Sequence, residues 1–207
     1  MDNLFDRWAN EYMQSVHASD TEGTYPFAGY ETIRTLVLKT LEAPRFKRVL
    51  DMGVGTGAVT SSLHEMGKEV VGVDSSRNML EKAEKAMKKA SFIHADFFSA
   101  LEGTIGAFDA VIFNYSIHHL SPAAQKALVL QIHDHLQPEG VILIGDVMRR
   151  TRAEIDSLKG EYIDIWDEEE HYPVYDELVD DRLSGLFDPT LVEVSHCAGV
   201  IRLVKRR

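Results

Sequence analysis

A glycine-rich segment is the part of the sequence that points most clearly to chemistry. It reads Val49-Leu50-Asp51-Met52-Gly53-Val54-Gly55-Thr56-Gly57, so an apolar run leads directly into three closely spaced glycines. Glycine suits a turn that uses positive φ angles and that a ligand approaches closely. Asp74 lies 74 − 53 = 21 residues after Gly53, at the end of a second apolar run. A carboxylate in that place can accept both ribose hydroxyls, so the pattern predicts a nucleoside site rather than a structural tight turn.

Asp51 helps to choose between two nucleoside cofactors. Gly53, Gly55 and Ala58 also satisfy the spacing of the dinucleotide-binding pattern G-x-G-x-x-A. Asp51, however, stands two residues before Gly53, where its carboxylate is expected to face the charged part of the ligand. It would repel the pyrophosphate of NAD, whereas it suits the ammonium and sulfonium groups of S-adenosylmethionine. The sequence therefore favours S-adenosylmethionine, with an NAD(P)-dependent oxidoreductase as the alternative.

Two adjacent histidines follow a later apolar run, in the stretch Phe113-Asn114-Tyr115-Ser116-Ile117-His118-His119-Leu120. In open α/β sheets the ligand lies outside the carboxyl ends of the strands, so this stretch is expected to face it. His118, with an ordinary pKa of about 6.5, could remove a proton from a methyl acceptor. Packing, cofactor contact or shaping of the substrate site are its alternative roles. His119 is expected to pack beneath the loop.

These residues need a scaffold, and the sequence indicates one in which short apolar runs alternate with helical patterns. Strands are predicted at 49–51, 69–74, 91–94, 108–114 and 141–145, and helices at 58–66, 76–89 and 123–136. Such alternation predicts parallel strands with crossover helices, hence an α/β sheet covered on both faces. Helical spacing also marks residues 4–13 and 33–41 before the sheet, and 153–166 and 174–186 after it. Two closing strands at 191–196 and 200–204 predict an antiparallel edge.

Composition narrows the classes of partner. With 207 residues, 44% of them hydrophobic, the chain is long enough for one domain with its own core. Its 22 basic and 33 acidic residues give a net charge of −11, which disfavours nucleic acid and anionic membranes. No apolar run approaches the roughly 18 residues of a membrane span. Without a visible signal peptide, and with Cys197 as the single cysteine, the expected location is cytoplasmic.

The motifs together resemble the class I S-adenosylmethionine-dependent methyltransferases, and the layout is most similar to the small bacterial methyltransferases of the YrrT-like group. The resemblance covers nearly the whole chain, including residues 5–12, which are similar to a capping helix of many small members. It implies a Rossmann-like, doubly wound seven-stranded sheet, mostly parallel with an antiparallel last strand. The expected single domain has capping helices (1–45), a cofactor-binding core (46–148), a helical lid (149–188) and a terminal strand pair (189–207).

The resemblance also implies roles by position. The glycines of the loop would line the cofactor site. Asp51 would reach the amino group of the cofactor, and Asp74 would bind its ribose. Asp96 would accept the adenine amino hydrogen with Phe97 beside the ring, unless Asp96 only caps a turn. The full set implied to contact the cofactor is Tyr12, Asp51, Gly53, Gly55, Gly57, Asp74, Ser75, Met79, Asp96, Phe97 and Asn114.

The same comparison by position argues against two kinds of chemistry. Metal-dependent members carry an acid after the fourth strand and an Asp-Asn pair after the fifth, whereas this chain has Asn114-Tyr115 and Asp146-Val147. We therefore expect no metal. No prolines follow Asn114, unlike in the enzymes that methylate amino groups of nucleic acids.

The expected function is methyl transfer from S-adenosylmethionine to a small molecule by in-line displacement. A non-catalytic S-adenosylmethionine-binding protein is the further alternative. The acidic residues 167–170 form either a solvated helix end or a wall that selects a small, cationic acceptor. The acceptor and the oligomeric state are left open.

Overall fold

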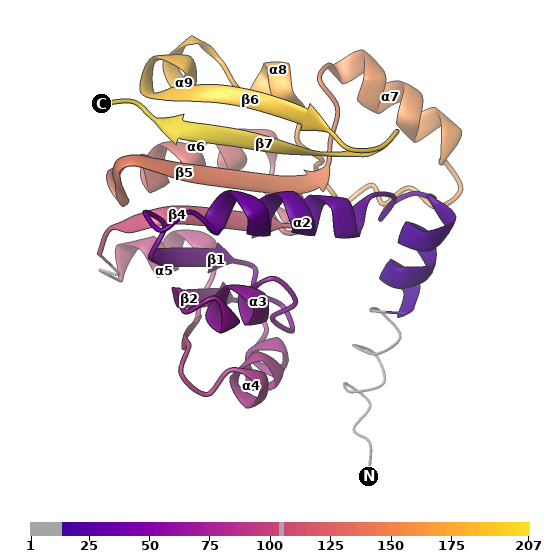
Figure 1. Cartoon of the computed structure of the whole chain (residues 1–207). Helices are drawn as coiled ribbons and strands as arrows, with labels where there is room; N and C mark the ends of the chain where they lie inside the picture. Colours follow the sequence, from indigo (N-terminus) through magenta and orange to yellow (C-terminus); the bar gives the residue numbers. More distant parts are fainter. Residues whose placement is uncertain (1–13, 104–105) are drawn as a thin grey trace.

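A seven-stranded sheet forms the framework of the molecule (Figure 1). The computed structural model describes residues 14–103 and 106–207. The strand order is β3-β2-β1-β4-β5-β7-β6. The strands are β1 (Arg48–Met52), β2 (Glu69–Asp74), β3 (Ser91–His94), β4 (Phe108–Asn114), β5 (Leu136–Val147), β6 (Phe187–Glu193) and β7 (Ala198–Lys205). The first five are parallel, and β7 runs antiparallel to both β5 and β6. The predicted fold class is confirmed.

Helices cover both faces of this sheet. One face packs against residues 14–22, which are helical, and against α2 (Tyr30–Leu41), α3 (Thr60–Glu65) and α7 (Arg152–Glu161). The other face packs against α5 (Phe97–Glu102), α6 (Pro122–Asp134), α8 (Tyr175–Leu178) and α9 (Asp181–Leu186). The helix α4 (Arg77–Ala86) contacts β2 and β3, and a short 3-10 helix, η1 (Ile117–His119), follows β4.

Alternating residues of the central strands supply the two cores. Val49 and Ile112 pack into the core beneath α2 and α3, whereas Leu50 and Val111 pack into the core beneath α6. All four side chains are fully buried. A strand buried on both faces carries apolar residues without a break, which is why these segments are recognisable in the sequence.

The strand order reverses between β1 and β4. The chain moves outward from β1 through β2 to β3, then returns to pair β4 with the opposite edge of β1. The crossovers on the two sides therefore diverge and leave a crevice at the carboxyl ends of β1 and β4. The glycine segment, which follows β1, and the two histidines, which follow β4, meet at this crevice.

Two sequence predictions about helices need correction, and one helix was not predicted. The predicted helix 174–186 is two short helices, because the Asp180 carboxylate accepts the Leu183 amide at 2.9 Å and starts α9 as its N-cap. The helix predicted at 153–166 ends at Glu161. The helix α5 was missed, since six residues are too few to display a helical period.

The strands agree more closely with their predicted ranges. The exceptions are β5, which extends beyond the predicted 141–145 at both ends, and β6, which begins four residues before the predicted 191–196. The predicted helix at residues 4–13 lies outside the described residues. Within the described part of the chain, no helix has the length and apolar character that crossing a membrane requires.

Candidate functional site

A cavity of about 510 Å³ occupies the crevice at the carboxyl ends of β1 and β4. This volume is within the range of small-molecule sites. Most lining residues lie at or after the carboxyl end of a strand. The rest come from the start of α2 with the segment before it, and from the segment between α7 and α8. They are Pro26, Phe27, Tyr30, Asp51, Gly53, Val54, Gly55, Thr56, Ala58, Val59, Asp74, Ser75, Ser76, Met79, Phe97, Asn114, Tyr115, Ser116, His118, His119, Val147, Glu170 and Tyr172.

The structure brings most of the residues singled out in the sequence to this cavity. Those on its wall are Asp51, Gly53, Gly55, Asp74, Ser75, Met79, Phe97, Asn114 and His118. Gly57 is not among the lining residues: a Cβ there would meet the end of the Met87 side chain. Asp96 is not on the wall either, and Tyr12 lies outside the described residues.

Two glycines shape the wall for different reasons. Gly53 has a φ of +88°, and a Cβ there would clash with the side chain of Ser116 in the turn after β4. Gly55 has a φ of +54°, but a Cβ there would meet nothing within 4 Å, because it points into open space beside the cavity. Gly53 therefore permits close packing of two turns, and Gly55 leaves room for a ligand.

Asp74 ties the glycine loop to the start of α4. One carboxylate oxygen accepts the Gly55 amide at 2.9 Å, and the other accepts the Ser76 amide at 2.8 Å. A carboxylate has about four acceptor positions, so acceptor capacity remains for a ligand. These two bonds also fix the direction of the carboxylate, which the sequence could not indicate.

Asp51 is a buried carboxylate on the wall of the cavity, with 2% of its surface exposed. The Thr60 hydroxyl donates a hydrogen bond to it. Burial raises the pKa of Asp51 to about 7, and the negative charge of Asp74 adds to this rise, while the bond from Thr60 opposes it. At neutral pH the site can therefore hold this carboxyl either protonated or charged.

The raised pKa of Asp51 predicts a pH-dependent stability. The unfolded carboxyl ionises near its ordinary pKa of about 3.9, so between about pH 4 and pH 7 the folded chain holds a proton that the unfolded chain lacks. The stabilising contribution is complete below about pH 4 and is lost as the pH rises through 7. It amounts to at most about 4 kcal/mol.

Denaturant unfolding of the ligand-free protein at several pH values checks this expectation. Asp51→Asn should show a flatter decline of the unfolding free energy between pH 5 and pH 8 than the parent. Parallel curves for the two proteins would contradict the raised pKa.

Among the described residues, two polar side-chain atoms at the carboxyl end of β4 are buried without a hydrogen-bond partner. They are Asn114 Oδ1 and the Tyr115 hydroxyl. Tyr115 also has a φ of +52°, a strained backbone state for a non-glycine residue. The Asn114 oxygen can only accept a hydrogen bond, whereas the Tyr115 hydroxyl can donate or accept one, so both atoms suit a ligand with polar groups. Among the described residues that line the cavity, none is Lys or Arg.

Asp96 and Phe97 are adjacent but differently placed. Asp96 caps α5, because its Oδ1 accepts the amides of Phe98 and Ser99 at 3.0 Å. These bonds and the one from the Ser99 hydroxyl lower the pKa of Asp96. Phe97 lines the cavity and packs edge-on against Phe113, with ring centroids 5.7 Å apart. The capping alternative describes what Asp96 does here, and its contact with adenine stays a prediction.

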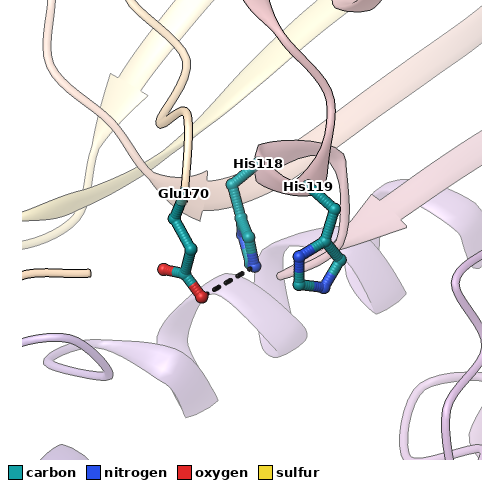
Figure 2. Close-up of side chains that lie close together, drawn as sticks. All are labelled: His118, His119 and Glu170. Atoms are coloured by element: carbon teal, nitrogen blue, oxygen red, sulfur yellow. Dashed lines mark ion pairs between the residues drawn. The ribbon is translucent and has the colours of Figure 1, made fainter. Parts of the chain in front are cut away.

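His118 forms a pair with Asp146, which is fully buried on β5. The imidazole Nδ1 lies 2.8 and 3.0 Å from the two Asp146 carboxylate oxygens, so Nδ1 carries a hydrogen and donates it. The other nitrogen, Nε2, lies 3.6 Å from Glu170 Oε1 (Figure 2). Burial alone would lower the pKa of His118, but Asp146 and then Glu170 outweigh it, and the pKa is raised.

Glu170 reaches this place through contacts between distant segments. The His171 amide donates to the His118 carbonyl at 2.8 Å, and the Gln125 side chain donates to the carbonyls of His171 and Leu120 at 2.5 and 2.9 Å. The Tyr172 hydroxyl donates to the Glu170 carboxylate. The sequence indicated only an acidic stretch at 167–170, because nothing in that stretch specifies that Glu170 lies beside His118.

His119 differs from its prediction. Its side chain is exposed on the cavity wall rather than packed beneath the loop, and its ring centroid lies 4.3 Å from that of His118. Figure 2 shows the two imidazoles and Glu170 converging. Partial removal of the ring from water, and then the neighbouring His118, lower the pKa of His119.

Comparison with known proteins places the chain in a family. A family described as "Methyltransferase domain" matches residues 49–140. An uncharacterized methyltransferase of Oceanobacillus iheyensis is 32% identical over 150 residues, which are 72% of this chain and 68% of that protein. The uncharacterized methyltransferase YrrT of Halobacillus halophilus is 24% identical over 210 residues, covering 98% of this chain and 96% of its own.

Solved structures share the fold. The magnesium protoporphyrin IX methyltransferase of Synechocystis with bound SAH aligns with a TM-score of 0.67 and 16% identity, over 86% of this chain and 84% of that chain. The N-methyltransferase NodS of Bradyrhizobium japonicum, in complex with S-adenosyl-L-homocysteine, aligns with a TM-score of 0.64 and 15% identity. The alignment covers 100% of this chain and 90% of that chain. With the curated relatives and the site geometry, the conclusion is that this chain belongs to the class I S-adenosylmethionine-dependent methyltransferases.

Proposed function

We propose that this protein transfers the methyl group of S-adenosylmethionine to a small neutral or cationic acceptor by in-line displacement. The observation that carries this proposal is the chemistry of the cavity wall. It combines the carboxylates of Asp51 and Asp74 and the unpartnered Asn114 oxygen with a lack of Lys and Arg among the described lining residues. Such a wall accepts hydrogen bonds and positive charge. It offers little to a pyrophosphate, which argues against NAD(P).

The residues of the chain have separate tasks in this proposal. S-adenosylmethionine, when bound, supplies a methyl group already activated on a positively charged sulfur. Asp74 accepts the ribose hydroxyls, and Asp51 faces the ammonium end. The side chains of Ser75 and Met79 flank the adenosine, and Gly55 leaves space for it. The protein then contributes mainly alignment of the two reactants.

The acceptor is proposed to lie between the turn after β4 and the lid. His118 Nε2 points toward Glu170 there, and Asp146 acts as a positioning residue through Nδ1. We propose His118 as the residue that acts on the nucleophilic atom of the acceptor. An anionic acceptor would face Asp51, Asp74 and Glu170, so a neutral or cationic one is favoured.

Calorimetry and a turnover assay test this function together. The parent protein should bind S-adenosylhomocysteine with a measurable heat and give none with NAD. It should then transfer labelled methyl from S-adenosylmethionine to a member of a panel of small amines, thiols and phenols. Tight NAD binding would overturn the proposal. Cofactor binding with no transfer to any panel member or to larger acceptors would favour the non-catalytic binding protein instead.

Asp51→Asn is expected to weaken S-adenosylhomocysteine binding by about 1–2 kcal/mol, the scale of one lost charge-assisted hydrogen bond. Adenosine lacks the ammonium group, so its affinity for the variant and the parent should be equal within about 0.5 kcal/mol. Calorimetric titration of both ligands into both proteins measures the difference. Equal losses for the two ligands would mean that Asp51 supports the loop and does not contact the amino acid part.

A further inference from the structure

We propose that His118, His119 and Glu170 bind a divalent metal ion of the zinc type at the acceptor end of the cavity. The three side chains each offer one ligand atom, and these atoms lie within 4.8 Å of one another. The positions after the fourth and fifth strands, from which no metal was expected, do not supply these ligands as a set. The carboxylate comes from the lid.

The spacing suits coordination. Two ligand atoms about 2.1 Å from a zinc ion lie about 3.4 Å apart at a tetrahedral angle. His118 Nε2 and Glu170 Oε1 are 3.6 Å apart, so an ion fits between them with little movement. His119 is exposed, and its ligand atom lies within 4.8 Å of the other two, so we propose it as the third ligand. Figure 2 shows the three side chains side by side, and all three line the cavity.

The ligands have the outer partners that metal sites use. Asp146 accepts from His118 Nδ1 and fixes the ring, so in the neutral imidazole the hydrogen lies on Nδ1 and Nε2 can bind an ion. The Tyr172 hydroxyl donates to Glu170, and Tyr25 is 2.7 Å from that hydroxyl, oxygen to oxygen. The backbone bond between His171 and His118 holds the lid and the turn in register. These contacts organise the two segments before any ion arrives.

The donor set indicates the kind of metal. Two imidazoles and one carboxylate suit Zn²⁺, whereas Mg²⁺ prefers oxygen ligands throughout. Three protein ligands leave a coordination position open, and all three residues line the cavity. The site is therefore built to hold an exchangeable ligand next to the expected methyl donor.

The role of the ion rests on the proposed function. A thiol or hydroxyl acceptor that replaces a metal-bound hydroxide coordinates as its anion, and the proton leaves with that hydroxide as water. The coordinated sulfur or oxygen is then the nucleophile for the methyl group. His118 acts on the acceptor through the ion and does not itself take the proton.

Titration of Zn²⁺ alone tests the site. The chelator-treated full-length protein should bind one Zn²⁺ per chain by calorimetry. His119→Ala and Glu170→Gln should each weaken this binding at least tenfold, since each removes one ligand. His133→Asn is the matched control, because His133 lies on α6, packs against Phe187 of β6 and does not line the cavity. Its affinity for Zn²⁺ should equal that of the parent.

S-adenosylhomocysteine titration of the same four proteins separates the two proposals. The metal-site variants should retain cofactor binding within about twofold, so loss of Zn²⁺ binding alone supports the metal site. Absence of saturable Zn²⁺ binding by the parent, or equal binding by all variants, would overturn the metal proposal while leaving cofactor binding intact. A parent that binds Zn²⁺ but not S-adenosylhomocysteine would overturn the proposed function instead. If chelation of the metal leaves the rate of methyl transfer unchanged, the ion has no part in the reaction.

Discussion

Gly55→Val is expected to lower the affinity for S-adenosylhomocysteine at least 100-fold while the protein remains folded. The position has a φ of +54° and faces open space beside the cavity, so a branched side chain would occupy the volume proposed for the cofactor. Valine at positive φ also strains the loop, at a cost of about 1–2 kcal/mol, which a domain with an intact core can tolerate. Calorimetry measures the affinity, and thermal unfolding measures the stability.

Gly67→Val provides the matched control for this substitution. Gly67 also has a positive φ, +78°, and a Cβ there would likewise meet nothing within 4 Å, but Gly67 is not among the residues that line the cavity. The control should show a similar loss of stability with unchanged affinity. Normal binding by Gly55→Val would mean that the loop glycine serves the turn and not the ligand.

Asp74→Ala is expected to reduce cofactor affinity at least tenfold. The substitution removes the proposed acceptor of two ribose hydroxyls, and each charge-assisted hydrogen bond contributes about 1.5–3 kcal/mol. It also removes the acceptors of the Gly55 and Ser76 amides, so the glycine loop loses its link to α4. Calorimetry with S-adenosylhomocysteine measures the affinity, and the melting temperature reports on the loop.

Asp74→Asn distinguishes these two effects. Asparagine keeps one acceptor oxygen but lacks the charge, so it should preserve more of the loop while binding the cofactor less well than the parent. We expect an affinity between those of the parent and Asp74→Ala. If both variants bind like the parent, the ribose does not lie against Asp74.

The glycine loop and Asp74 show where sequence reasoning works. The glycine loop follows β1, and Asp74 is the last residue of β2. Both strands are buried on both faces, so in each case the site residues directly adjoin an apolar run in the sequence. Parallel strands place such ends at one edge of the sheet without further information. The fold class follows from the same alternation, because crossover helices are the ordinary connection between parallel strands.

The details between these elements were harder to predict. The helical pattern at 174–186 is interrupted because Asp180 caps a new helix, a local hydrogen bond that competes with the regular period. Gly57 belongs to the same glycine pattern as Gly55, yet it faces Met87, since the direction of each residue depends on how the turn is packed. Spacing indicates that a turn exists but not which of its residues reaches a ligand.

By itself the sequence therefore determined the parallel sheet. It also determined that the glycine loop, Asp51 and Asp74 lie near the carboxyl ends of two strands, because strand and turn are specified by neighbouring residues. Only the tertiary structure decided that His118 lies between Asp146 and Glu170, which come from β5 and from the lid. Their meeting depends on the Gln125 side chain, which bonds His171 46 residues away, and on the bond from the His171 amide to His118, 171 − 118 = 53 residues away. Such contacts leave no periodic pattern, because they arise from the packing of one segment on another after the strands have formed.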